Sequence, residues 1–538
     1  MPNSRHDLFN YTSGSWLVNK ELRLAERKHE FDDIELRRLA AESVGRTLKD
    51  VDSMEKLDEG GFNRVFRVTM HDGFQMIARV PYPLTQPKFY VVASEVATMG
   101  FLRAHGVPIP KVYGYSPTSD NAAKTEYIFM EFVKGNKLAD LWPHLKDVEM
   151  AAVLRALVEL ESRIMSIPFP AGGSLYYADD LKRVAGDKKG IPISLKGQQF
   201  CIGPDVRVDM WHGRRLQLDV SRGPYETVEE ALVAPAHKEI AYLERFGQPL
   251  LPFQRWRREA YNFDKQSPLD HIENIKRYVR MAPLLIPKNP SHQAFCLRHP
   301  DLHPSNVMVY LSPDSDHMEI TSVIDWQHAT ILPLFLVANI PQRFQNYDDP
   351  VSQSLILPSF PPNADKMDED ELRQAVAIHD ARLTHYYYAK ATAELNSCHH
   401  ESLWDWRSIV IRRLWHHAGR PWNAEIHDLK ALLIEATEDW EALVGPGLPC
   451  PVEFEPEDVS KTKAFSERLQ VPDEIFQDVQ NGLGFGSQTW ISNDDYEKAK
   501  ELAELLKARL LGAIAEEELR NNVQANWLLD DMDEKDYM

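Results

Sequence analysis

A short stretch near the middle of the chain carries residue types that can transfer a phosphoryl group. It reads RHPDLHPSNVMV over residues 298–309 and spaces His299, Asp301 and Asn306 as H-x-D-L-x-x-x-N. An Asp in this setting can orient an acceptor hydroxyl and take its proton, and an Asn five residues later can offer its amide oxygen to Mg²⁺. The spacing therefore predicts a catalytic loop with His299 and Asp301 as catalytic residues and Asn306 as a metal ligand.

A second acidic residue follows this loop at a position suited to a metal ion. The segment MEITSVIDWQHA predicts an apolar strand that ends at Asp325. A carboxylate at the end of a buried strand, shortly after the catalytic loop, is the expected second ligand of Mg²⁺. A lone Asp after a strand is more often a turn former, so this prediction depends on the order of the two motifs.

The elements that must position these residues change character along the chain. Alternating apolar residues and Gly-containing turns predict strands in the first quarter, and helical spacing predominates after Gly135. The expected elements are a helix over 17–45, a hairpin with turns at Gly60-Gly61 and Asp72-Gly73, a helix over 88–105, strands over 111–116 and 126–133, and helices near 150–164, 368–396 and 495–522. The Gly- and Pro-rich residues 168–230 are expected to form an elaborate loop region.

Composition excludes several classes of protein. Asp and Glu number 81 against 61 Lys and Arg, and the net charge of −20 argues against nucleic-acid binding. The longest nearly apolar stretch, Ile331–Ile340, is too short to cross a bilayer, so no transmembrane segment is expected. The four cysteines form no CxxC pair, and no H-E-x-x-H, G-x-S-x-G or Walker A string is present. The acidic tail LLDDMDEKDYM is expected to be solvated, with docking on a basic groove as the alternative.

Together these motifs resemble the aminoglycoside-phosphotransferase or kinase-like phosphotransferase family. The closer resemblance is to a fungal branch that contains the altered-inheritance-of-mitochondria protein 9 group. It rests on strings from about residue 8 to the C-terminus: FNYTSGSWL, IARVPYPLTQPKFYVVASEVATM, VPIPKVYGYS, YIFMEFVKG, GGSLYY, IGPD, RGPYE, RHPDLHPSNV, IDWQHATILPLFL and FGSQTW. The resemblance implies an α+β, bilobal protein-kinase-like fold with a small sheet-rich N-lobe and a large helical C-lobe.

The same resemblance implies four regions and a nucleotide site between the lobes. The regions are a helical N-terminal extension over 1–45, the N-lobe over 46–134, the C-lobe with the catalytic motifs over 135–455, and a helical C-terminal extension with an acidic tail over 456–538. The loop that the family folds over the ATP phosphates corresponds to Gly60, Gly61, Phe62 and Asn63, with an ordinary hairpin turn as the alternative. The hinge would lie at 130–133, where the backbone of Glu131 and Val133 would face the adenine.

The basic residue of the third strand is an arginine. Arg79 stands where protein kinases have a Lys, and Glu95 stands where the helix Glu that pairs with that Lys belongs. Arg79 is expected to bind phosphate, although a guanidinium is not interchangeable with an ammonium. A structural Arg–Glu pair with weak or absent ATP binding is the alternative.

The expected activity is transfer of the γ-phosphoryl group of ATP, with Mg²⁺, to a hydroxyl of a small-molecule acceptor. The sequence does not identify the acceptor, choose between ATP and GTP, or fix the oligomeric state. The alternative is a nucleotide-binding pseudokinase that acts as a regulator or scaffold in mitochondria. The resemblance points to mitochondria, but residues 1–30 show no presequence, so the cytoplasm is the alternative compartment.

Cations and one aromatic residue in the loop region could meet an anionic or polar acceptor, but scattered surface arginines are favoured: Arg207, Trp211, Arg214, Arg215 and Arg222.

Overall fold

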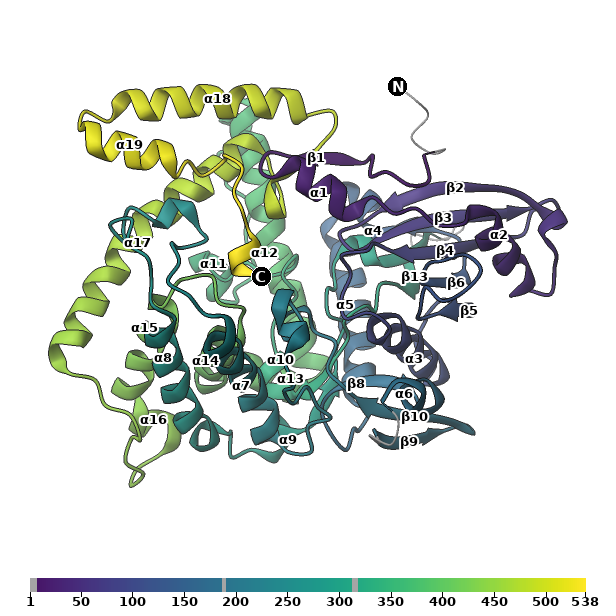
Figure 1. Cartoon of the computed structure of the whole chain (residues 1–538), viewed down its shortest axis with the longest axis horizontal. Coiled ribbons are helices and arrows are strands. Elements are labelled where there is room, and N and C mark those ends of the chain that lie inside the picture. Colours follow the sequence, from purple (N-terminus) through teal and green to yellow (C-terminus); the bar gives the residue numbers. More distant parts are fainter. Residues whose placement is uncertain (1–6, 186–189, 312–317) are drawn as a thin grey trace.

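A five-stranded antiparallel sheet forms the smaller lobe of the protein (Figure 1). This is a computed structural model, and it describes residues 7–185, 190–311 and 318–538. The strand order is β2-β3-β4-β6-β5. The elements of this lobe are β2 (Val51–Glu59), β3 (Asn63–Met70), β4 (Gln75–Pro81), α3 (Tyr90–Ala104), β5 (Val112–Ser116) and β6 (Tyr127–Glu131). The predicted hairpin, helix and pair of strands are therefore confirmed.

Alternation along β3 and β4 determines what each face of this sheet contacts. Phe66 and Val68 lie opposite Ala78 and Met76, and all four side chains are buried on the face that packs against helix α2 (Asp33–Glu42). Because neighbouring residues of a strand point to opposite faces, Arg79 lies on the other face. That face looks toward α3 and the large lobe.

The large lobe is mainly helical and contains a three-stranded and a two-stranded antiparallel sheet. Strands β12 and β13 pair with each other, and β7 adds to the far side of β12; β11 pairs with β14. The elements are β7 (Asn136–Lys137), α4 (Leu138–Leu141), α5 (Asp147–Met165), β11 (Phe295–Leu297), β12 (Val307–Leu311), β13 (Met318–Val323), β14 (Ile331–Pro333), α10 (Leu334–Val337), α11 (Pro350–Gln353), α12 (Glu369–Leu395), α13 (Ser397–Trp404), α14 (Trp406–Gly419), α15 (His427–Glu438) and α16 (Trp440–Val444). With the small sheet lobe, this confirms the predicted bilobal α+β fold.

An insertion between α5 and β11 is more ordered than its Gly- and Pro-rich sequence predicts. It contains β8 (Ser174–Tyr177), α6 (Ala178–Ala185), β9 (Ile191–Leu195), β10 (Gln198–Gly203), α7 (Val228–Phe246), α8 (Pro268–Met281) and α9 (Pro290–Gln293). The sheet order is β8-β10-β9, and β8 packs against α3 of the small lobe. The expectation of an irregular loop over all of 168–230 was wrong, because these strands pair within the insertion and are stabilised by burial against α3.

Two of the arginines expected at the surface of this insertion are buried. Arg215 is fully buried and forms an ion pair with Glu239 of α7. Arg222 is also buried, and its guanidinium donates to the backbone oxygens of Met210 and Leu218 at 3.0 and 3.1 Å. The interpretation of these two residues as scattered surface arginines was therefore wrong, since each side chain is buried and bonds to another segment of the insertion.

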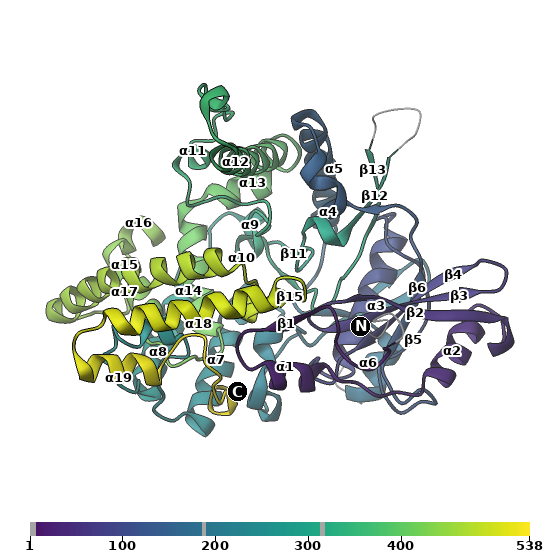
Figure 2. The same ribbon diagram turned by 90° about the horizontal axis from the view of Figure 1, so that it is seen from above.

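The N-terminal and C-terminal extensions lie side by side. Residues before the small lobe form β1 (Gly14–Trp16), α1 (Lys20–Arg27) and α2, and the C-terminal region forms α17 (Pro456–Leu483), β15 (Trp490–Ser492), α18 (Tyr496–Ala513) and α19 (Glu517–Ala525). Strand β1 pairs with β15, as Figure 2 shows from above. The helix expected over 17–45 is broken into α1 and α2, because Asp32 caps a new helix by accepting from Glu35 N at 3.0 Å. Residues 1–6 of the expected N-terminal extension lie outside the described residues.

The acidic C-terminal tail is docked, and the expectation of a solvated end was wrong. Trp527, Leu529 and Glu534 are buried. Glu534 forms an ion pair with Arg23 of α1, and its Oε1 accepts from Asn19 Nδ2 at 2.6 Å. The tail therefore pairs with cations and amides of the N-terminal extension, which sequence spacing does not reveal.

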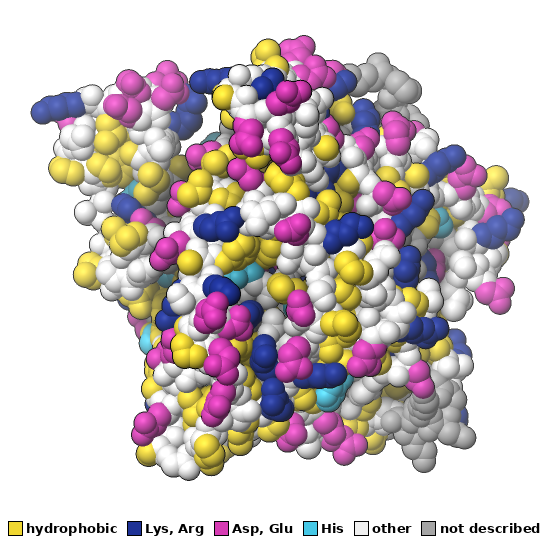
Figure 3. All heavy atoms as spheres, turned by 60° about the vertical axis from the view of Figure 1, so that its left-hand side comes forward, with side chains coloured by type: hydrophobic (Ala, Val, Ile, Leu, Met, Phe, Trp, Pro, Cys, Tyr) yellow, Lys and Arg dark blue, Asp and Glu magenta, His cyan; other side chains and the backbone are white. Residues whose placement is uncertain are grey.

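The face of the molecule that carries α15 and α17 mixes charges of both signs. Figure 3, which turns the side of α15 and α17 forward, shows Asp and Glu interspersed with Lys and Arg and no continuous field of either sign. Of the helices in residues 7–185, 190–311 and 318–538, none combines the length and the apolar character that crossing a membrane requires.

The buried charge cluster around Glu239 yields a stability prediction. Lys238 and Arg215 both contact this carboxylate, with Lys238 Nζ at 2.9 Å, and all three side chains are buried. Glu239→Gln leaves two buried cations without their counter-charge, and we expect a loss of about 3–5 kcal/mol in the free energy of unfolding by urea. The exposed residue Glu229 of the same helix supplies the control, since Glu229→Gln removes the same charge from the surface.

The same cluster predicts a direction for the pH dependence. Burial opposes ionisation of Glu239, but Arg215 and Lys238 outweigh it and lower the pKa of this carboxyl to about 2. Because the folded-state pKa lies below the usual value, the stabilisation is complete above about pH 4.5 and is lost as the pH falls toward 2. Urea titrations should therefore show that the difference in the free energy of unfolding between wild type and Glu239→Gln becomes smaller as the pH falls over that range. A difference that stayed constant from pH 6 to pH 3 would contradict the assignment.

Candidate phosphotransfer site

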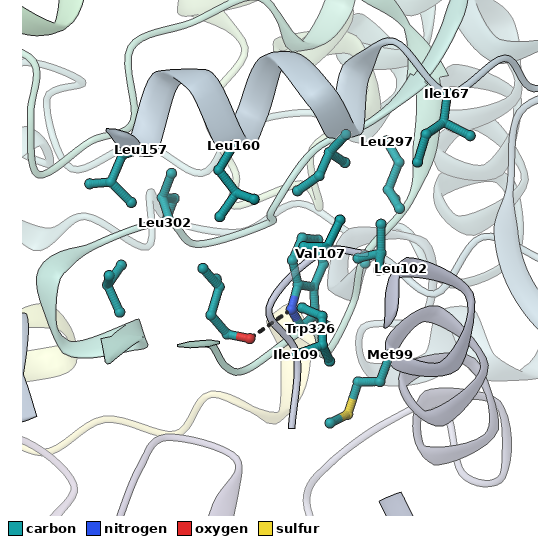
Figure 4. Packing of buried hydrophobic residues seen from close by; sticks show 14 of the residues in the cluster. Met99, Leu102, Val107, Ile109, Leu157, Leu160, Ile167, Leu297, Leu302 and Trp326 are labelled. Carbon is teal, nitrogen blue, oxygen red and sulfur yellow. Dashed lines mark hydrogen bonds between the residues drawn. The ribbon is translucent and has the colours of Figure 1, made fainter. Parts of the chain in front are cut away.

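The catalytic-loop motif lies between β11 and β12 and is anchored on a hydrophobic core. Leu297, Leu302 and Trp326 are buried beneath α5, as Figure 4 shows. Trp326 Nε1 donates to Val323 O at 3.1 Å, the dashed line in that view. Burial of these side chains on both sides of the polar residues fixes the loop, so the residues between them can remain accessible.

Arg298 adds a polar anchor just before the motif. Its Nη2 lies 2.6 Å from Glu161 Oε1 on α5 and 3.1 Å from the hydroxyl of Tyr388 on α12. The guanidinium also donates to Asn339 O at 2.9 Å. One buried side chain therefore connects the start of the loop to two helices and to the segment after β14.

His299 joins the two sequence stretches that hold the predicted site residues. Asp301 N donates to His299 Nδ1 at 3.1 Å, and His299 Nε2 lies 2.9 Å from Ile324 O. Since Nδ1 accepts, Nε2 must carry the hydrogen and donate, so the ring is neutral. Burial lowers the pKa of His299, which favours this form. The imidazole thus connects the backbone at Asp301 to the residue before Asp325.

Asn306 lies at the centre of the same arrangement and is buried. Its Nδ2 donates to Asp301 O at 2.9 Å and contacts His303 Nε2 at 3.1 Å, while Ile324 N donates to Asn306 O at 3.0 Å. These bonds fix the amide with its nitrogen toward the loop. Within the described part of the chain no hydrogen bond engages Asn306 Oδ1, so this oxygen remains available to a ligand.

Asp301 itself is exposed. Its carboxylate is 72% accessible and lies 3.5 Å from His303 Nε2. The hydrogen bond from His303 lowers the pKa of Asp301, against the opposing effect of burial. The side chain is therefore ionised near neutral pH and free on most of its surface.

Asp325 meets Arg79 across the two lobes. Arg79 Nη2 lies 2.5 Å from Asp325 Oδ1, and Arg79 Nη1 forms an ion pair with Glu95 of α3. Asp325 has a φ of 66°, a left-handed conformation that Asp tolerates better than most residues. Burial opposes ionisation of Asp325, but the guanidinium prevails and lowers the pKa of this carboxyl. Since 44% of the Asp325 side chain stays exposed, it can still contact a ligand.

The glycine turn between β2 and β3 lies against the residues that follow Asp325. Gly60 and Gly61 are exposed, and Gly60 N donates to Asn63 O at 2.9 Å. The ring of Phe62 packs edge-on against His328, with centroids 5.3 Å apart. Asn63 Nδ2 lies 2.5 Å from Gln327 Oε1.

Gln327 and His328 were not predicted as site residues. Gln327 Oε1 accepts from Arg79 Nη2 at 2.8 Å as well as from Asn63, so one amide connects the glycine turn to the arginine. His328 Nδ1 lies 2.7 Å from Val206 O of the insertion. The only available signal was their position directly after Asp325 in the string IDWQHA.

The expected hinge follows the end of β6. Glu131 is the last residue of that strand, and its N–H donates to Lys111 O at 2.8 Å. Glu131 Oε2 also accepts from Lys111 N at 3.0 Å. Val133 lies two residues beyond the strand and is half-buried. The backbone N–H of Glu131 therefore already donates to another backbone oxygen and does not face an open site.

The structure thus brings most of the predicted residues together. Asp301, Asn306 and Asp325 meet through His299, and Arg79, Glu95 and Asn63 join them through ion pairs and Gln327. Among the described residues, Glu131 pairs with Lys111 and Arg103, and neither Glu131 nor Val133 forms a hydrogen bond or ion pair with this cluster. Amide and carboxylate oxygens at Asn306 and Asp325 are hard ligands of the kind that Mg²⁺ prefers. In the described ranges no group of three His, Cys, Asp or Glu side chains could hold a metal ion, so any ion here would draw further ligands from water or substrate.

Comparison with known proteins identifies relatives at two levels. The family model of the phosphotransferase enzyme family matches residues 53–335. Subtelomeric hrmA-associated cluster protein of Aspergillus fumigatus, strain Af293, is 34% identical over 484 residues, which cover 83% of this chain and 90% of the relative. Altered inheritance of mitochondria protein 9, mitochondrial, of Yarrowia lipolytica is 26% identical over 538 residues, covering 92% and 86%. The predicted resemblance is confirmed by these matches.

Solved structures of low similarity were also found. The ADP-bound aminoglycoside phosphotransferase APH(2'')-Ib is 15% identical with a TM-score of 0.32, covering 74% of this chain and 97% of that chain. At this TM-score the likeness says nothing about individual residues.

The bridging position of His299 predicts a pH-dependent loss of stability on mutation. His299→Phe keeps a ring but leaves Asp301 N and Ile324 O unpaired, so we expect a loss of about 2–3 kcal/mol in the free energy of unfolding at pH 7.5. The pKa of His299 is lowered below 6.5, so its contribution is complete above pH 6.5 and decreases as the pH falls through and below that value. Urea unfolding should therefore show a smaller difference from wild type at pH 5.5 than at pH 7.5. Equal losses for the exposed control His144→Phe would refute the bridging role.

Proposed function

This chain belongs to the phosphotransferase enzyme family, and we propose that it transfers the γ-phosphoryl group of ATP to a hydroxyl of a small-molecule acceptor. One observation carries the proposal. Asp301, Asn306 and Asp325, from two separate stretches, are held together by His299 and by backbone hydrogen bonds at the junction of the two lobes. A hydroxyl-orienting carboxylate beside two hard oxygen ligands is the minimum that phosphoryl transfer requires of a protein.

Asp301 would act on the acceptor. Its exposed, ionised carboxylate can accept a hydrogen bond from the acceptor hydroxyl and point that oxygen at the γ-phosphorus. Because its pKa is lowered, Asp301 is a weak base and takes the proton only as the new P–O bond forms and the bond to the β-phosphate oxygen breaks. Orientation is therefore its main contribution.

The remaining residues would hold the triphosphate and its cation. Asn306 Oδ1 and the Asp325 carboxylate would hold Mg²⁺, which when bound neutralises charge on the phosphates. Arg79 would bind phosphate oxygens, and backbone N–H groups within residues 61–63 would face them from above, since the N–H of Gly60 already donates to Asn63 O. His299 differs from the expected catalytic role: both ring nitrogens are engaged by backbone atoms, so we assign it as a positioning residue.

A second candidate function rests on the state of Arg79. This cation already contacts two carboxylates, Glu95 and Asp325, so little of its charge is left for phosphate. A pseudokinase that regulates a partner does not transfer phosphate, so it could keep Arg79 paired with both carboxylates. Addition of Mg·ATP separates the two: an enzyme yields a phosphorylated product by mass spectrometry, whereas a pseudokinase shows at most a thermal shift.

The compartment we propose is the mitochondrion. The Yarrowia lipolytica relative carries the word mitochondrial in its name and aligns with 92% of this chain. Fractionation of cells that express the full-length protein with a C-terminal tag checks this, and recovery in the cytosol alone would overturn it.

Two aspartate substitutions should separate chemistry from binding. We expect Asp301→Asn to lower kcat about 10³-fold while the thermal shift caused by Mg·ATP persists, because this carboxylate is assigned to the acceptor hydroxyl and not to the cation. Asp325→Asn should abolish both turnover and the magnesium-dependent part of the shift. Turnover is measured by mass spectrometry of a metabolite extract incubated with γ-¹⁸O-labelled ATP.

The exposed Asp120 provides a control of the same chemistry. Asp120→Asn lies in the loop between β5 and β6 and should behave as wild type in both assays. Normal turnover by Asp301→Asn would refute the assigned role, and absence of any Mg·ATP shift in wild type would refute the nucleotide site.

A further inference from the structure

The base of the glycine turn is held by a buried carboxylate that the proposed chemistry does not use. Glu59 ends β2 directly before Gly60, and its side chain is 1% exposed. One carboxylate oxygen, Oε1, accepts from Lys56 Nζ and Arg64 Nε at 3.0 Å each. These two cations flank the turn on β2 and β3. The carboxylate therefore closes the turn from inside.

The other oxygen of Glu59 is held by the N-terminal segment. Oε2 accepts from Thr12 N at 2.8 Å, from Thr12 Oγ1 at 3.0 Å and from Ser13 Oγ at 2.8 Å. The flanking cations reach the same segment, since Lys56 Nζ donates to Asn10 O at 3.0 Å and to Thr12 Oγ1 at 2.7 Å. Despite desolvation, these partners lower the pKa of Glu59 and keep it charged.

The same segment is fastened to the C-terminal extension. Strand β1 pairs with β15 from Gly14 opposite Ser492 to Trp16 opposite Trp490. Trp490 Nε1 donates to the Tyr11 hydroxyl at 2.9 Å, and Asn493 Nδ2 donates to Thr12 O at 2.6 Å. A Cβ at Gly14 would lie 2.5 Å from the Trp490 ring, so only glycine permits this close approach.

The extension is in turn attached to the large lobe. Phe476 of α17 stacks on Trp256 with ring centroids 3.6 Å apart, and Asp473 Oδ2 accepts from Arg257 Nη2 at 2.7 Å. A continuous series of contacts therefore leads from the insertion of the large lobe through α17, β15 and β1 to Glu59. Figure 1 shows β1 between the small lobe and the C-terminal helices.

We propose that residues 10–16 and 489–493, here called the strap, position the glycine turn for the triphosphate, with Glu59 as the positioning residue through which they act. Gly60 and Gly61 have no side chains, and a Cβ on Gly61 would meet nothing within 4 Å, so these two residues contribute no packing. Their place depends on the residues that flank them, which are Phe62 and Asn63 on one side and Glu59 at the base. The C-terminal extension thereby sets nucleotide affinity, and this part of the inference rests on the proposed function.

The mildest test removes the two side-chain hydroxyls that bind Glu59. Thr12→Val combined with Ser13→Ala leaves the backbone and the β1–β15 pairing in place. We expect hydrogen exchange of residues 57–64 to become faster and the Kd for Mg·ATP to rise about tenfold, because two hydrogen bonds to Glu59 and the one that Lys56 donates to Thr12 Oγ1 are lost. We expect kcat at saturating nucleotide to change less than twofold. The exposed pair Thr118 and Ser119 in the same lobe gives the matched control, Thr118→Val with Ser119→Ala.

A second variant tests the distant end of the strap. Trp490→Ala removes the ring that contacts Gly14 and Tyr11, and it should speed exchange at residues 57–64 although Trp490 does not touch the turn. Unchanged exchange at 57–64 in both variants overturns the strap. If hydrogen exchange at residues 57–64 becomes faster but the Kd for Mg·ATP stays unchanged, the strap holds the turn but does not control nucleotide affinity, and that part of the proposal is overturned. If wild type binds no Mg·ATP, the proposed function fails, while the exchange data still decide whether the strap holds the turn.

Discussion

A single guanidinium joins the three elements on which the candidate site depends. Arg79 comes from β4, Glu95 from α3 and Asp325 from the turn after β13, and the two carboxylates bind different nitrogens of the same fork. A lysine ammonium is a compact charge and does not offer two separate, rigidly spaced nitrogen donors of this kind. Because the Arg79 side chain is almost fully buried, its position depends on both carboxylates. The relative position of the lobes and the orientation of Asp325 are therefore coupled through one residue.

Local pattern was sufficient to predict the elements that carry this arrangement. The hairpin of β3 and β4 follows from strict alternation of apolar residues around Asp72-Gly73, and Gly73 has the positive φ of 85° that such a turn requires. The spacing of His299, Asp301 and Asn306 predicted a catalytic loop, and the structure places these three residues in one segment between β11 and β12. The hairpin prediction succeeds because it depends on residues close together in sequence.

Contacts between distant residues explain what the sequence did not reveal. No local pattern indicates that His299 Nε2 bonds to Ile324 O or that Glu59 accepts hydrogen bonds from Thr12 and Ser13. The buried ion pair between Arg215 and Glu239 likewise has no local signal. In the insertion, Gly and Pro separate short strands that are stabilised by pairing with one another and by packing on α3, so composition alone predicted a loop. The sequence likewise gives no sign that Gln327 bonds to both Arg79 and Asn63, because these residues come from different lobes.

The ion pairs of Arg79 also constrain how ligands would enter the proposed site. A cation at Asp325 competes with Arg79 for the same carboxylate, and a triphosphate competes with Asp325 for the same guanidinium. A ligand that replaces the Arg79–Asp325 pair by itself leaves one member of the pair without its partner, which is costly in a partly buried setting. When both are present, the guanidinium released from Asp325 gains phosphate and the carboxylate gains the cation, so no charge stays unpaired. The geometry therefore favours joint binding of metal and nucleotide over binding of either one alone, as expected for two ligands linked through a shared ion pair.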